Sequence, residues 1–168
     1  MTDIDAVVFD RIEGVIGIFQ LKWQDFNIAE VKQQRSRAKD FVSRVDAWAT
    51  AISDWIAEFG LEALCRVLQI SPVDGIPVTN IRLFAIGRSA ARFKSYGYQP
   101  SRPDVAHCTW AQFLRLRYEI GPVENVITRL HDAIRTESNG IPRLDNVSQE
   151  IVAAGQSILF EDFWFECE

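Results

Sequence analysis

The amino-acid sequence predicts an α/β (α+β) fold, with a small mixed β-sheet that begins in an N-terminal β-hairpin and is flanked by helices, one of them long. Two segments rich in Val, Ile and Phe near the N-terminus predict the hairpin, and residues 35–59 carry a helical repeat of apolar residues. Shorter strand-like and helix-like segments then alternate, which is typical of helices packed on a sheet. The 168 residues, 48% of them hydrophobic, favour one domain over 1–168 with a single sizeable core.

The hairpin and the long helix are the clearest elements. Residues 3–9 and 15–23 are the two strands, and residues 11–14 are the turn between them. The helix over 35–59 is predicted from apolar residues that recur over three heptads, and Gly60 ends it before a short helix over 61–69. The apolar positions of the long helix are Ala38, Phe41, Val42, Val45, Trp48, Ala49, Ile52, Trp55, Ile56 and Phe59.

The second half of the chain predicts two short strands and two or more helices. Residues 80–87 and 104–108 are the strands, with a helical turn or two over 89–95 between them. Thr109 is the expected N-cap of the next helix. A further helix is expected from Pro122 to about Thr136, followed by a turn at Asn139–Gly140. The last twelve residues fit either a strand or an amphipathic helix.

Charge is distributed unevenly along the chain. The net charge is −5, which argues against nucleic-acid binding by the whole surface. However, residues 1–118 hold 15 of the 18 basic residues, whereas the region from about 119 holds 10 of the 23 acidic ones. We therefore expect a mildly basic body followed by an acidic, helical C-terminal region.

The cysteines and the apolar runs predict a cytoplasmic protein with no membrane partner. Cys65, Cys108 and Cys167 are widely spaced and form no CxxC pair, as expected in a reducing compartment. No apolar run approaches the ~18 residues that a membrane helix needs. The N-terminus carries Asp3 and Asp5, where a signal peptide would carry basic residues.

A polar group interrupts the apolar pattern at the end of the second strand. Because side chains alternate along a strand, Gln20 and Lys22 share one face. If the turn is centred between Ile12 and Glu13, Asp5 lies opposite Gln20. If the turn is Glu13–Gly14, Asp5 lies opposite Lys22. In either register a carboxylate, an amide and an ammonium group gather at one place.

The segments "DIDAVVFD" and "GVIGIFQLKW" resemble the motif core of the PD-(D/E)xK, or restriction-endonuclease-like, nuclease superfamily. In that superfamily an Asp opens one strand and a Glu/Gln-x-Lys tripeptide lies on the next. The resemblance implies a Mg²⁺-dependent deoxyribonuclease core in which Asp5 and Gln20 bind the metal and Lys22 is the catalytic or phosphate-contacting base. It also implies that the Leu21 carbonyl faces the metal. Two features depart from the superfamily pattern: position 20 is Gln rather than the commoner Glu, and only four residues precede Asp5.

Basic residues from two separate segments of the chain could contact DNA. They lie near the start of the long helix and after the strand that ends at Gly87, and a positively charged groove is what phosphates require. These candidate contacts are Arg35, Arg37, Arg88, Arg92 and Lys94. The alternative interpretation is an ordinary solvated surface.

Two further features have their own interpretations. His107 and Cys108 are neighbours on a predicted strand, so they point to opposite faces and make a poor metal pair. The helix over 35–59 is long enough to extend past a small sheet, and its remaining apolar stripe predicts a homodimer. The alternative to a nuclease or a decayed relative of one is therefore a non-catalytic protein-binding or oligomerisation module.

Overall fold

The structure is a computed structural model that describes residues 3–22, 31–70, 77–88, 98–140, 149–153 and 156–160. The expected helical turn over 89–95 lies outside these residues.

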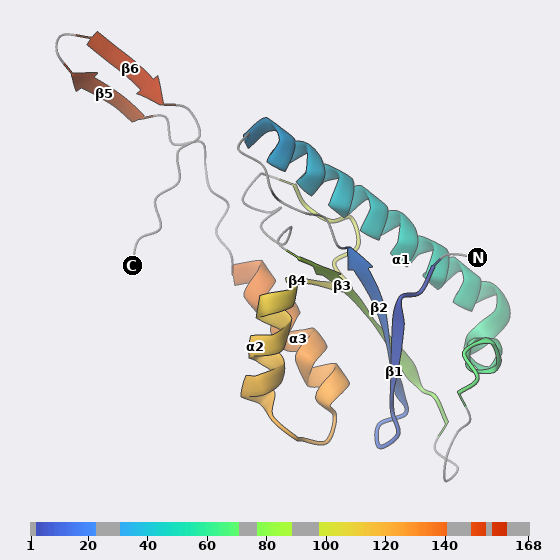
Figure 1. Cartoon of the computed structure of the whole chain (residues 1–168). Helices are drawn as coiled ribbons and strands as arrows, with labels where there is room; N and C mark the ends of the chain where they lie inside the picture. The colour runs from blue at the N-terminus through green and yellow to red at the C-terminus, as the bar shows by residue number, and fades with distance from the viewer. Residues whose placement is uncertain are drawn as a thin grey trace.

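A four-stranded mixed sheet forms the centre of the molecule (Figure 1). The strands follow their sequence order across the sheet, and only the first pair is antiparallel. The strands are β1 (Ala6–Asp10), β2 (Val15–Lys22), β3 (Asn80–Gly87) and β4 (Val105–Thr109). The predicted fold class is confirmed: a small mixed sheet with an N-terminal hairpin, flanked by helices that include one long helix.

The hairpin adopts the first of the two predicted registers. Ala6 pairs with Phe19 and Asp10 with Val15, so the turn is centred between Ile12 and Glu13. Asp10 explains this choice, because its Oδ1 accepts hydrogen bonds from the backbone N–H groups of Ile12 (2.9 Å) and Glu13 (3.2 Å). An aspartate that bonds the backbone just ahead of it stabilises a turn at that point.

One face of the sheet is covered by α1 (Val31–Val67), which crosses all of it (Figure 1). Gly60 has φ 81° and ψ 167° and breaks the helix into two segments, as the sequence predicts. The apolar stripe packs on the sheet as expected over most of its length, and Trp48 is buried. Trp55, by contrast, is only partly buried.

The opposite face is covered by α2 (Trp110–Ile120) and α3 (Val126–Gly140). Thr109 is the N-cap of α2, and its hydroxyl accepts from the backbone N–H of Gln112 (3.1 Å). These helices pack on β2, β3 and β4, with Phe84 and Ile134 fully buried between them.

The C-terminal part differs from the sequence prediction in two places. The helix expected from Pro122 begins only at Val126, because Asn125 has φ 60°, a left-handed conformation that Asn tolerates better than most residues. Asn139 and Gly140 then belong to the last turn of α3 rather than to a separate turn.

The acidic C-terminal region also contains a hairpin, β5 (Gln149–Ala153) with β6 (Gln156–Phe160), which forms a two-stranded sheet of its own. The sequence allowed either a strand or an amphipathic helix for the last twelve residues. The structure has a strand there as far as Phe160. Among the helices of the described residues, none has the length and apolar character needed to cross a membrane.

Candidate functional site

Polar side chains gather where the parallel strands end, on the sheet face that α1 covers. Gln20 pairs with Ala85, and Ala85 pairs with His107, so these residues form one row across β2, β3 and β4. The hairpin register extends this row to Asp5, just before β1. The carboxyl ends of parallel strands are a common location for binding sites in α/β sheets.

Asp5 and Gln20 are in direct contact. The Asp5 Oδ2 atom accepts a hydrogen bond from Nε2 of Gln20 and another from the backbone N–H of Leu21, the latter at 2.6 Å. Gln20 is only 4% exposed, so its amide group needs such a partner, whereas Asp5 is exposed. The Asp5 carboxylate thus ties the segment just before β1 to the end of β2. Both hydrogen bonds use Oδ2, and neither uses Oδ1.

The oxygen atoms around Asp5 suit a hard cation such as Mg²⁺. The N–H and C=O groups of a strand residue point to the same neighbouring strand, so the Leu21 carbonyl lies on the Asp5 side of β2 as well. Gln20 now presents its nitrogen to Asp5, and a rotation of its terminal amide would present its oxygen instead. The set of a carboxylate, an amide oxygen and a carbonyl oxygen therefore fits a weakly held Mg²⁺ that keeps several waters.

Lys22 follows Gln20 on the same face and is partly buried. It pairs with Gly87, which leaves the space beside it on β3 without a side chain. The Lys22 carbonyl accepts from the backbone N–H of Arg88 (3.3 Å), so Arg88 begins directly beside it. The three residues of the predicted site are thus on one face of the sheet, with Asp5 and Gln20 in contact and Lys22 one step further along β2.

Glu13 and Glu30 are the other acidic residues close to the hairpin in the sequence that could supply a ligand. Glu13 lies in the hairpin turn, at the opposite end of β2 from Gln20, where its Oε2 accepts from Thr128 Oγ1 (2.8 Å). It is therefore not part of this site. Glu30 lies outside the described residues. Within the part of the chain that the structure describes, no three His, Cys, Asp or Glu residues form a metal-binding cluster.

The five basic residues expected to contact DNA have different positions. Arg88 is exposed at the end of β3, beside Lys22, and Arg37 is partly buried on α1. Arg35 belongs to α1, but its side chain is outside the described part, as are Arg92 and Lys94 altogether. The geometry therefore brings the backbone of Arg88 beside Lys22 and leaves the DNA contacts of all five residues as predictions.

His107 also belongs to this row, and the sequence pattern did not predict that it lies level with Gln20. Its Nδ1 lies 3.0 Å from the Val105 carbonyl, which can only accept, so Nδ1 carries the proton. Phe41 of α1 packs edge-on against its ring, with centroids 6.3 Å apart. The alignment of strand ends in a parallel sheet could have indicated this position.

Cys108 points to the other face, as strand alternation predicts, and is fully buried there. Burial raises the pKa of its thiol to about 12. A Cys/His nucleophilic pair is therefore excluded at His107 and Cys108.

No protein-family model, no curated protein and no solved structure matches this chain. The hypothesis of a nuclease site consequently depends on the residues themselves and on their geometry.

Proposed function

We propose that the chain carries the core of a metal-dependent deoxyribonuclease of the PD-(D/E)xK type. The observation that carries this proposal is the direct contact of Asp5 with Gln20, on the same face as Lys22, where the parallel strands end. The motif resemblance selects Asp5, Gln20 and Lys22. Asp5 and Gln20 are fifteen positions apart in sequence and are in contact, and Lys22 follows Gln20 by two positions on the same face. A cytoplasmic location belongs to the same proposal.

Each residue has a distinct part in this proposal. Asp5 contributes a carboxylate oxygen to the cation, and Gln20 contributes its amide oxygen after rotation of the terminal amide. Mg²⁺ supplies positive charge opposite the charge that develops on the phosphate during hydrolysis. The Lys22 ammonium group, a compact cation with three donors, binds a phosphate oxygen and stabilises that charge.

DNA would reach this site along the edge formed by the carboxyl ends of β2 and β3. The Arg88 backbone lies beside Lys22, and in this proposal the Arg88 guanidinium group binds a backbone phosphate with two parallel hydrogen bonds. Arg35, Arg37, Arg92 and Lys94 complete the proposed phosphate-binding surface. Phosphate contacts of this kind position the duplex without reading its sequence.

Nicking of supercoiled plasmid DNA tests the proposal. The wild-type protein should convert plasmid to nicked and linear forms with Mg²⁺ or Mn²⁺ and should not do so with EDTA. Lys22→Ala should lower the rate by at least about 100-fold, since a charge that acts in the transition state is removed. Lys39→Ala removes the same group from an exposed position on α1 and should retain cleavage. Equal rates for both variants would contradict the role of Lys22.

Gln20→Glu tests the metal site without relying on cleavage. A second carboxylate beside Asp5 repels it when no cation is present, so the variant should be less stable than wild type by about 1 kcal/mol in EDTA. Mg²⁺ should restore that loss, because a cation that binds only the folded state stabilises it. Melting curves of both proteins with and without Mg²⁺ give the answer, and identical metal responses would end the nuclease interpretation of this site.

A non-catalytic interaction module is the second candidate, and the exposed side of α2 favours it. Trp110, Leu114 and Tyr118 recur every four residues and are 41%, 48% and 88% exposed, so they form an apolar stripe on the surface. A homodimer through the 35–59 helix has less surface available, because most of that stripe packs on the sheet and chiefly Phe59 remains exposed. Sedimentation of wild type and Tyr118→Glu would show whether α2 mediates self-association.

A further inference from the structure

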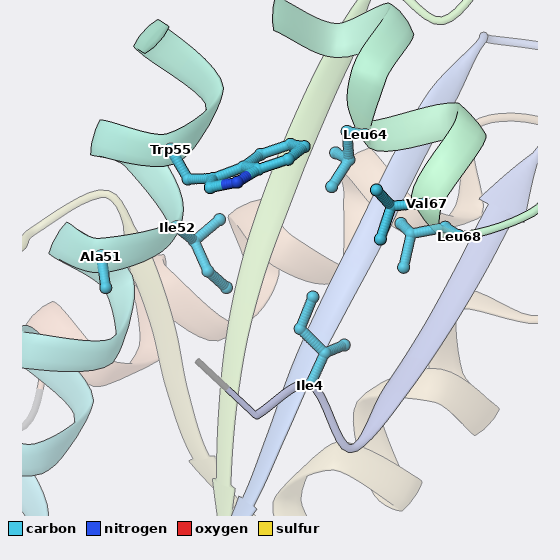
Figure 2. A pocket seen from close by; sticks show the side chains of 7 residues that line it. All are labelled: Ile4, Ala51, Ile52, Trp55, Leu64, Val67 and Leu68. Carbon is cyan, nitrogen blue, oxygen red and sulfur yellow. The ribbon is translucent and has the colours of Figure 1, made fainter. Parts of the chain in front are cut away.

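The break of α1 at Gly60 creates a pocket between the two helical segments (Figure 2). Ile52 and Trp55 line it from the first segment, and Leu64 lines it from the second. In Figure 2 the Trp55 ring extends across the pocket toward Leu64, with the side chain of Ile52 beneath it. A continuous helix would carry Leu64 away from Trp55, so the pocket depends on the positive φ of Gly60.

The floor of the pocket comes from the start of the chain. Ile4 points into it from the segment that leads to β1 (Figure 2). This segment is held in place one residue earlier, where the carbonyl of Asp3 accepts a hydrogen bond from Trp48 Nε1 (2.8 Å). The walls of the pocket are therefore formed by elements that are themselves fixed by the core, and the pocket is partly open to solvent at Ala51 and Val67.

The side chains that line the pocket are apolar. Its volume is about 140 Å³, and every side chain that lines it is a hydrocarbon or an indole. A water molecule needs about 2 to 4 polar partners, which these side chains do not offer. An enclosed cavity of about 150 Å³ lined by Leu, Ile and Phe binds benzene, so the volume of this open pocket is sufficient for one ring.

We propose that this pocket is a binding site for a small uncharged aromatic molecule of the size of benzene or toluene. The volume fits a single ring with at most a short alkyl group. Trp55 favours an aromatic occupant, because two rings gain from edge-to-face or offset contact in addition to burial. Phe59, 51% exposed and with its ring centroid 5.1 Å from that of Trp55, extends this aromatic wall to the surface. The site is separate from the proposed nuclease site and does not depend on it.

Binding of toluene to the full chain tests the proposal, with the methyl resonances of Ile4, Ile52 and Leu64 as the readout. Toluene should shift all three in a saturable manner. Benzoate, which has the same ring and a charge that the pocket cannot solvate, should bind at least about tenfold more weakly. Absence of saturable shifts up to the solubility of toluene, or equal affinity for benzoate, would overturn the proposal.

A matched pair of variants locates the site. Ala51 lines the pocket and Ala57 lies on the exposed side of the same helix segment, outside the lining. Ala51→Leu should fill the space and weaken toluene binding at least about tenfold, whereas Ala57→Leu should bind toluene as wild type does. Melting curves verify that both variants are folded. Wild-type affinity in Ala51→Leu would show that toluene binds elsewhere and would overturn the assignment.

Discussion

The two faces of the central sheet are covered to different extents. On the α1 face, apolar side chains of all four strands are packed under the helix, including Val7 and Phe9 of β1. On the opposite face, α2 and α3 reach β2, β3 and β4, and the β1 side chains Ala6 and Val8 remain exposed. The polar residues of the candidate site lie at the edge of the more completely covered face, so a packed framework positions them.

Both faces also bury polar groups, since Gln20 and His107 are each 4% exposed on the α1 face. Gln20 and Lys22 are at the edge of the α1 face, where a substrate or a cation can approach Asp5. On the other face, His131 and Cys108 are buried. Burial lowers the pKa of the His131 imidazole, so the neutral form is favoured there. The buried titratable groups of the α2/α3 core are therefore kept neutral.

The largest expected effect is the loss of Trp48 from the α1 face. Trp48→Ala removes a 4% exposed indole and its bond to Asp3, and should lower the free energy of unfolding by about 3–5 kcal/mol. Trp110→Ala removes the same side chain from the surface of α2, where it is 41% exposed and stacks on Phe113, and should cost about 1 kcal/mol. Urea denaturation of both variants measures the contrast, and equal losses would contradict the comparison of the two faces.

A smaller effect is expected where α3 approaches β2 at Gly17. A Cβ atom on Gly17 would lie 3.1 Å from Phe19 Cε2 and 3.3 Å from Ile127 Cγ2. Gly17→Val should therefore lower the free energy of unfolding by about 1–3 kcal/mol through overpacking. Ala6→Val adds bulk to the uncovered strand on the same face and should change stability by less than about 0.5 kcal/mol. Thermal unfolding of the two variants would show whether α3 stops short of β1.

The smallest effect is the pH dependence contributed by His131. Its pKa is lowered in the folded state, so as pH falls below about 6.5 the unfolded chain binds a proton before the folded protein does. Stability should fall in that range by at most about 1.4 kcal/mol per pH unit and level off below the folded-state pKa. His131→Gln can still donate to the Asp104 carbonyl, which His131 Nε2 contacts at 2.9 Å, and should show a flatter profile. His107 is present in both proteins, so the difference belongs to His131 alone.

The fold could be predicted well where local chemistry determines it. The strand over 80–87, the N-cap at Thr109 and the break at Gly60 are all where the sequence places them. The start of α3 could not be predicted, because it depends on the left-handed conformation of Asn125 rather than on the proline before it. Of the hairpin near the chain end, β5 was not predicted, and the segment of β6 was ambiguous because a short apolar run fits a strand or a helix equally well.

The candidate site could be predicted in part. The alternation of side chains placed Gln20 and Lys22 on one face, but the choice of partner for Asp5 depended on the turn. Asp10 decides it through two backbone hydrogen bonds that the sequence pattern alone does not select. His107 was missed because its alignment with Gln20 runs through Ala85, and register between parallel strands is set by tertiary packing.

The bond between Trp48 and the Asp3 carbonyl has a consequence for which carboxylate reaches Gln20. A slip of β1 by two residues would keep its apolar side chains on the same faces and would bring Asp3, another aspartate, to the position of Asp5. Apolar contacts alone distinguish poorly between these two pairings. The hydrogen bond from Trp48 Nε1 fixes the Asp3 backbone at one position along α1. The helix thereby favours the register in which Asp5, and not Asp3, contacts Gln20.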